Sequence, residues 1–268
     1  MKKNLLEFMA VIFLAFVSTI GLSAQENISQ QKQPNADPLK ANLAKAQSLA
    51  KQGKKEEASK IYTDLMQNYP DNKDDVQGWL NINMKRTPTG EVEAIKQLED
   101  LQNLYSKNTG ILFFKFYFEA KHGQNEEAIK DCDKLIKFQP DTAINYVCKG
   151  QVLVTMKKYK DACKAFDKAT KLNPNRFDFW VMRAGAMERN GKYDDAIASI
   201  NKAIELKPQY PANYYNRACF YSLKGDAVNA MTDLKKAIEG NPSFKKTASK
   251  DEDFQSLSDN VDFKKLIQ

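Results

Sequence analysis

The chain has 268 residues, of which 42% are hydrophobic and 28% are charged, with a formal net charge of +7. Glycine (11) and proline (9) are sparse, which favours helices over a turn-rich β fold. The lysines are spread along the chain without a basic cluster interleaved with aromatic residues, so the composition argues against nucleic-acid binding.

The N-terminus has the pattern of a secretory signal, which we predict over residues 1–24. An apolar run from Phe8 to Ile20 follows two lysines, and small residues then lead to the polar Gln25. The run is shorter than the ~20 residues of a membrane-spanning helix, although an uncleaved membrane anchor is the alternative. We therefore expect an exported protein, periplasmic or secreted, that is membrane-associated if the signal is not cleaved.

An alanine recurs along the chain at an almost constant interval. The interval is 34 residues except for the first, which is 36. The six positions are Ala58, Ala94, Ala128, Ala162, Ala196 and Ala230. Twelve residues after each alanine come Pro70, Ser106, Pro140, Pro174, Pro208 and Pro242. A period of this length, ended by proline, predicts a stacked array of helical hairpins.

Other columns of the repeat predict how the helices pack. Bulky or apolar side chains lie four residues after each alanine, and leucine or alanine lies seven after, so all three positions share one helix face. Twelve residues before the alanine the residue is small, except for Ile82 and Phe116. Ile82 therefore predicts a looser second unit, and Phe116 predicts a wider helix crossing in the third. Glycines between the two helices of a unit predict left-handed turns at Gly53, Gly123, Gly191 and Gly225.

These columns resemble the tetratricopeptide repeat family, most clearly over Tyr146–Pro174 and Tyr214–Pro242. The resemblance implies an all-α fold: an α-solenoid of six helical hairpins, wound as a right-handed superhelix and closed by a C-terminal capping helix. The units are 39–72, 75–108, 109–142, 143–176, 177–210 and 211–244, after a flexible polar linker over 25–38. Residues 245–268 form the capping segment, in which Phe254, Leu257, Phe263 and Leu266 are expected to pack on the last repeat.

In the family, the first helix of each repeat lines the concave face, and this implies a groove that binds a partner. The lining positions are Trp79, Asn83, Arg86, Phe113, Tyr117, Val147, Gln151, Val181, Glu188, Arg189, Tyr215 and Cys219. Rigid aromatic side chains are typical anchors of interfaces, so the four aromatic residues of this set are the expected anchors unless they cover neighbouring hairpins. The positions that clamp acidic chaperone tails in some relatives are apolar here, which favours an extended or helical partner segment. Those positions are Leu43, Trp79, Phe113 and Val147.

The sequence carries no pattern that predicts catalysis, a cofactor or a metal site. His122 is the only histidine and is expected to be exposed in the turn before Gly123. The four cysteines lack close paired spacing, and we expect buried thiols, with one disulfide as the alternative. The expected function is a non-catalytic scaffold or adaptor of the bacterial cell envelope that binds another protein. The alternative is recognition of a glycan or peptidoglycan fragment, which the aromatic residues would stack on.

Overall fold

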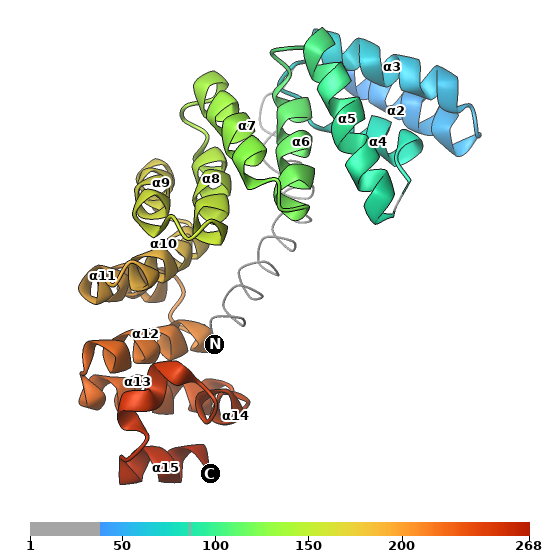
Figure 1. The fold of residues 1–268 in the computed structure, drawn as a ribbon. Helices are drawn as coiled ribbons and strands as arrows, with labels where there is room; N and C mark the ends of the chain where they lie inside the picture. The colour runs from blue at the N-terminus through green and yellow to red at the C-terminus, as the bar shows by residue number, and fades with distance from the viewer. Residues whose placement is uncertain (1–37, 86) are drawn as a thin grey trace. The chain divides into compact units, whose positions relative to one another are not determined.

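The computed structural model describes residues 38–85 and 87–268. The predicted signal, the linker up to residue 37 and Arg86 lie outside the described residues. Every regular element in the described part is a helix, and none of these helices is long and apolar enough to cross a membrane (Figure 1). The protein is therefore an all-α solenoid, and it divides into two compact units over residues 38–158 and 159–268.

Most of the helices follow one another along the chain as pairs joined by short turns. The first compact unit contains α2 (Pro38–Lys51), α3 (Lys55–Asn68), α4 (Asp74–Asn83), α5 (Pro88–Leu104), α6 (Thr109–Lys121), α7 (Asn125–Phe138) and α8 (Ala143–Thr155). The second contains α9 (Tyr159–Leu172), α10 (Phe177–Arg189), α11 (Tyr193–Leu206), α12 (Pro211–Lys224), α13 (Ala227–Gly240), α14 (Phe244–Ala248), the 3₁₀ helix η1 (Glu252–Leu257) and α15 (Val261–Ile267).

The alanine column forms the centre of each hairpin, as the repeat predicts. All six alanines are at most 1% exposed, and the residues four positions later are at most 2% exposed. Small side chains at these points let the two helix axes approach closely, so the bulky column fills the space between hairpins. In the hairpins α2–α3, α6–α7, α10–α11 and α12–α13 the two helices lie side by side (Figure 1).

The turns inside the hairpins also follow the prediction. The four turn glycines have φ between 73° and 88°, the left-handed region that residues with a Cβ rarely adopt. The fourth repeat uses Lys157 at the equivalent position, with φ 58°. A lysine in this conformation is strained, which the sequence pattern did not indicate.

The second repeat departs from the others in the lengths of its helices, whereas the looser packing expected there stays a prediction. Its first helix, α4, has only 10 residues and its second, α5, has 17. Helix α4 packs against α2, α3 and α6, whereas α5 packs against α6. Gly78 allows the close approach of α4 to α3, because a Cβ there would lie 2.3 Å from the Tyr62 ring. The wider crossing expected from Phe116 stays a prediction, although this side chain is fully buried.

A basic residue links each of three first helices to the repeat that precedes it. Lys149, Arg183 and Arg217 are 34 residues apart, and each contacts the residue sixteen positions before it. Those partners are Asp133, Asp167 and Asn201 on α7, α9 and α11. We call this series the basic ladder. Each contact connects a first helix to the second helix of the preceding repeat within one compact unit.

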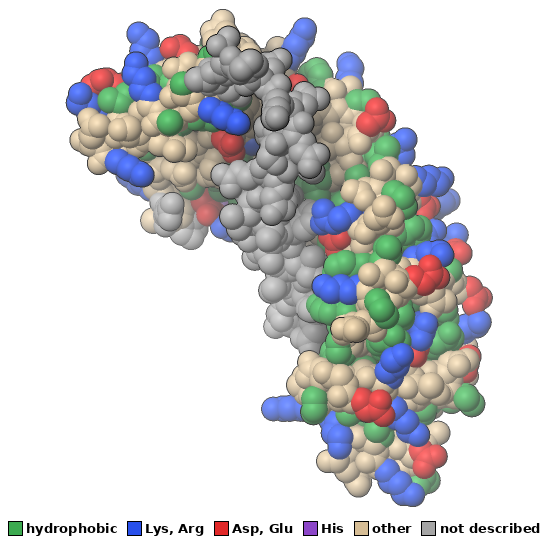
Figure 2. All heavy atoms as spheres, turned by 180° about the vertical axis from the view of Figure 1, so that it is seen from behind, with side chains coloured by type: hydrophobic (Ala, Val, Ile, Leu, Met, Phe, Trp, Pro, Cys, Tyr) green, Lys and Arg blue, Asp and Glu red, His purple; other side chains and the backbone are tan. Residues whose placement is uncertain are grey.

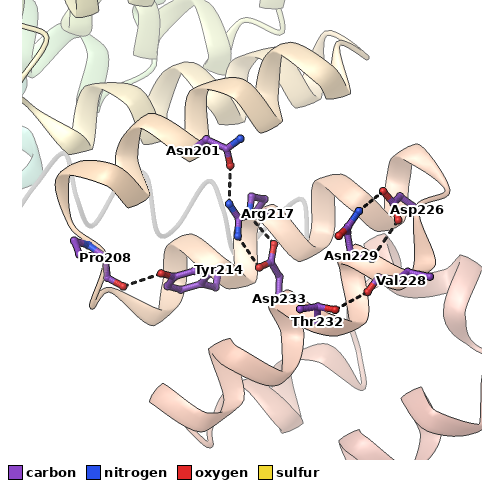
Figure 3. Close-up of polar contacts among 9 residues, drawn as sticks. All are labelled: Asn201, Pro208, Tyr214, Arg217, Asp226, Val228, Asn229, Thr232 and Asp233. Carbon is purple, nitrogen blue, oxygen red and sulfur yellow. Dashed lines mark hydrogen bonds and ion pairs between the residues drawn. The ribbon is translucent and has the colours of Figure 1, made fainter.

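Arg217 makes the most complete set of contacts in the ladder (Figure 3). Its Nη1 donates to Asn201 Oδ1 at 2.7 Å, and two further nitrogens donate to the Asp233 carboxylate at 2.6 and 2.7 Å. Asp233 is only 5% exposed, so this carboxylate depends on the guanidinium for its charge compensation.

The capping segment packs on the last repeat through the apolar residues that the sequence singled out. Phe254, Leu257 and Phe263 are at most 5% exposed, and η1 packs directly on α12. Leu266 is half-buried.

Candidate functional site

The predicted groove residues of α4 lie on a partly exposed surface. Trp79 is half-buried and packs on the cluster formed by Ala46, Ala58 and Tyr62. Asn83 is exposed, and its amide donates to the Trp79 carbonyl at 2.9 Å and to Ser59 Oγ at 3.3 Å. Of the predicted residues, Arg86 lies outside the described part of the chain. This helix therefore presents the Asn83 amide to solvent, four residues after a half-buried Trp79.

Two other predicted groove residues belong to the packed interior. Phe113 is 3% exposed and Val147 is fully buried, so the prediction that they line an accessible groove is wrong. The Phe113 ring contacts Phe114 and has the Lys73 ammonium 3.8 Å from its centre. Burial lowers the pKa of Lys73. In this arrangement Phe113 stabilises a partly desolvated cation by a cation–π contact.

Tyr117 and Gln151 are half-buried on α6 and α8. The Tyr117 ring lies edge-to-face against Phe118, with centroids 5.3 Å apart. One turn further along α6, Lys121 pairs with Glu91 at 2.6 Å. Tyr117 is therefore a partly exposed aromatic residue beside a charged pair, as an anchor residue in an interface would be.

His122 is not an exposed turn residue, in contrast to the prediction. Its Nε2 lies 2.9 Å from Glu91 Oε2, and its side chain is 21% exposed. Although burial alone would raise the pKa of Glu91, hydrogen bonds from Lys121 and His122 lower it. The contact joins α5 to the end of α6, which gives the histidine a structural role.

In the second compact unit, the predicted residues of α10 are half-buried. These are Val181, Glu188 and Arg189. The predicted residues of α12 are buried instead: Tyr215 is 4% exposed and Cys219 is 1% exposed.

Tyr215 is covered by the chain's own C-terminal segment. Its hydroxyl donates to Asp251 Oδ2 at 2.7 Å, and its ring stacks on Phe244 with centroids 4.6 Å apart. Tyr215 was predicted to line the groove as an anchor, and its burial under the C-terminal segment corrects this. The repeat pattern ends before the capping segment, so it gave no signal of which face that segment covers.

Cys219, Asp251 and Asp253 bring three groups of metal-ligand type within 4.8 Å of one another. Burial raises the pKa of Cys219 well above its usual value, raises that of Asp251, and raises that of Asp253 to about 6. A metal needs deprotonated ligands, whereas these shifts favour proton-bound groups. The contacts that this cluster makes are those that hold the C-terminal segment on α12. All four cysteines of the chain are buried with free thiols, as expected.

The surface also has a polar pocket of about 380 Å³ beside α3 and the end of α4. Its lining consists of Lys55, Glu56, Ser59, Lys60, Thr63 and Asn83, none of which is aromatic. On the face seen in Figure 2, basic and acidic side chains are interspersed, so the positive net charge does not gather into one patch there.

Comparison with known families agrees with the helix pattern. Sequence models described as tetratricopeptide repeat match residues 40–72, 149–211 and 211–244. The chain is a tetratricopeptide repeat protein. No curated protein sequence matches it.

Solved structures of tetratricopeptide repeat proteins share the fold. A crystal structure of MamA is similar with a TM-score of 0.55 and 23% identity, over 60% of this chain and 95% of MamA. The MamA RS-1 ArsTM double mutant gives a TM-score of 0.57 and 20% identity, over 68% and 96% of the two chains. YrrB, described as having an unusual peptide-binding site, gives 0.55 and 18%, over 68% and 92%. The structural similarity shows a shared fold, and at identities below 25% it shows the fold alone.

Proposed function

We propose that this tetratricopeptide repeat protein is a non-catalytic scaffold of the bacterial cell envelope. It binds a segment of another protein on the first helices of the unit over residues 38–158. The signal-like N-terminus supports export, and the repeat family supports a role in protein–protein interaction. The peptide-binding site named for YrrB supports the same use of a similar fold.

The proposal rests on the side chains of α4 and α6 that stay accessible to solvent in the folded unit. Trp79 and Tyr117 are only half-buried. Asn83, four residues after Trp79, is exposed. Trp79 shares its column of the repeat with the buried Phe113 and Val147, whereas Asn83 and Tyr117 share the column four residues later. Aromatic rings with a rigid, packed base lose little entropy on binding, so these side chains suit the anchoring of a partner segment.

Capture from a bacterial envelope extract tests this surface. The bait is the full chain as wild type, as Trp79→Ala/Tyr117→Ala, and as Asn83→Lys. Phe138→Ala is the matched control, because Phe138 is an exposed aromatic residue on α7, a second helix. We expect the double variant and Asn83→Lys to lose a partner that wild type and Phe138→Ala retain.

Two checks make the outcome interpretable. Trp79 packs on a core cluster, so the melting curve of each bait must match that of wild type before captures are compared. Asn83→Lys changes an exposed position and tests the surface without removing core contacts. Equal capture by all four baits would place the partner elsewhere.

The export proposal has a separate test. The mass of the protein recovered from fractionated cells shows whether residues 1–24 are removed and in which fraction it occurs. We expect a mature chain that begins at Gln25, outside the inner membrane. An intact chain confined to the cytoplasm would refute the envelope assignment while leaving the binding surface untouched.

A further inference from the structure

The C-terminal segment over residues 251–257 binds α12 through one face of a 3₁₀ helix. Three residues per turn place Asp251, Phe254 and Leu257 above one another. These three are 7%, 1% and 2% exposed, whereas Glu252 and Gln255 between them are exposed. The buried face thus has the pattern Asp-x-x-Phe-x-x-Leu.

The surface that receives this segment is equally regular. Tyr215, Cys219 and Ser222 lie four and three residues apart and therefore share one face of α12. Besides the bond from Tyr215 to Asp251, the Tyr215 and Phe254 rings meet edge-to-face with centroids 5.7 Å apart. Ser222 Oγ lies 2.9 Å from Ser256 Oγ, which also donates to the Ser222 carbonyl at 3.2 Å. We call these three residues the α12 face.

The docked segment is held by apolar burial and opposed by its charges. Phe254 and Leu257 remove apolar surface from water, which favours docking. Within the described part of the chain, neither Asp251 nor Asp253 forms an ion pair, and burial raises the pKa of both carboxyl groups. The desolvation of these carboxylates disfavours the docked state, although the Tyr215 hydroxyl at Asp251 and the charge of Arg189 near Asp253 offset part of this cost.

The remainder of the last repeat has contacts of its own. Helices α12 and α13 lie side by side, and Arg217 joins them through Asp233 (Figure 3). Release of residues 251–257 breaks none of these contacts. The α12–α13 hairpin can therefore stay folded while residues 251–257 leave the α12 face and another segment binds there.

We propose that the α12 face is a binding surface for a short 3₁₀ segment, and that a partner segment with the pattern Asp-x-x-Phe-x-x-Leu exchanges with residues 251–257. This inference deepens the proposed scaffold function, because it adds a second interaction surface and states the chemistry of its partner. The resident segment shows what that partner must supply: a carboxylate that accepts from the Tyr215 hydroxyl, and a phenyl ring that meets the Tyr215 ring edge-to-face.

The test uses the full chain and a fluorescent peptide of residues 249–268, with binding followed by anisotropy. Wild type is compared with full-length Phe254→Ala, which weakens the resident segment only. We expect the peptide to bind Phe254→Ala at least about tenfold more tightly than wild type. A peptide that itself carries Phe254→Ala should not bind.

A pair of tyrosine variants locates the binding site. Tyr215→Phe, added to the Phe254→Ala chain, removes the hydroxyl that donates to Asp251 and should weaken peptide binding by about tenfold. Tyr214→Phe is the matched control: it removes a hydrogen bond to the Pro208 carbonyl from the neighbouring, equally buried tyrosine. Its effect on peptide binding should be small.

Hydrogen exchange of the wild-type chain keeps the proposal testable if Phe254→Ala unfolds. We expect the amides of residues 252–257 to exchange by local opening, faster than those of α12 and α13. Exchange of all three only through joint unfolding would overturn the proposal, and so would a folded Phe254→Ala chain that binds no peptide. Either result leaves the surface on α4 and α6 to be judged by its own capture experiment.

Discussion

Arg217→Met removes the cation of the last step of the basic ladder while it keeps an apolar stem of similar length. Asp233 then stays buried, with a side chain 7% exposed, without the two hydrogen bonds it receives from the guanidinium. Breaking a buried pair by removal of one partner typically costs about 3–5 kcal/mol. Because the Arg217 side chain is 21% exposed, water offsets part of this loss, and we expect about 2–4 kcal/mol.

Urea unfolding measured by tryptophan fluorescence reports this cost. The chain has two tryptophans: Trp79 in the first compact unit and Trp180 on α10 in the second. A Trp79→Phe background leaves Trp180 to follow the unit that contains Arg217. With a slope of about 2 kcal/mol per molar urea, the midpoint should fall by about 1–2 M.

Two comparisons decide whether the buried pair is the cause. Asp233→Asn alone and together with Arg217→Met completes a double-mutant cycle, and we expect a coupling energy above about 1 kcal/mol. Lys202→Met removes an exposed ion pair with Glu205 and should cost less than about 1 kcal/mol. If Arg217→Met costs no more than Lys202→Met, the ladder does not stabilise the stacking of repeats.

Three further changes test other parts of the fold. Glu119 is 1% exposed, and burial together with Asp131 raises its pKa to about 7. The folded state therefore binds this proton more tightly than the unfolded state, so the stabilising contribution is present at acidic pH and is lost as the pH rises through about 7. Glu119→Gln should abolish this loss, on the order of 2–3 kcal/mol, in melting temperatures compared at pH 5 and pH 8. Lys157→Gly relieves a left-handed backbone and should raise the free energy of unfolding by roughly 0.5–1 kcal/mol in urea, and a decrease would contradict the strain assigned to this turn. Ala162→Leu overpacks a fully buried helix contact and should lower the free energy of unfolding by roughly 1–3 kcal/mol, whereas an unchanged melting temperature would refute the register of that repeat.

The periodic parts of the fold were predictable because equivalent positions of successive repeats pack in the same way. Ala162 and its five counterparts place the hairpin centres, and four glycines place the turns. The basic ladder was also visible in principle, since Arg183 and its equivalents recur every 34 residues with a polar residue sixteen positions earlier. It was missed because that partner belongs to the preceding repeat, outside the unit in which columns are compared.

The candidate site was less predictable. A position in the repeat indicates which face of the helix a side chain lies on, but it does not indicate how much of that side chain stays exposed. Phe113 and Trp79 occupy the same column, yet one is buried beneath Lys73 and the other keeps an exposed edge. Tyr215 was misassigned for a different reason: its cover comes from η1, which has no counterpart in earlier repeats. Such contacts depend on tertiary packing that no local pattern encodes.

The basic ladder gives the repeats interchangeable junctions. A unit such as 177–210 carries both halves of the contact: Arg183 reaches back to the preceding unit, and Asn201 receives Arg217 from the next. Any unit with both groups at these offsets presents the same polar connection at its two ends. Duplication or deletion of the fourth or fifth repeat, which carry both groups, would therefore preserve this pairing at the junctions that the ladder spans.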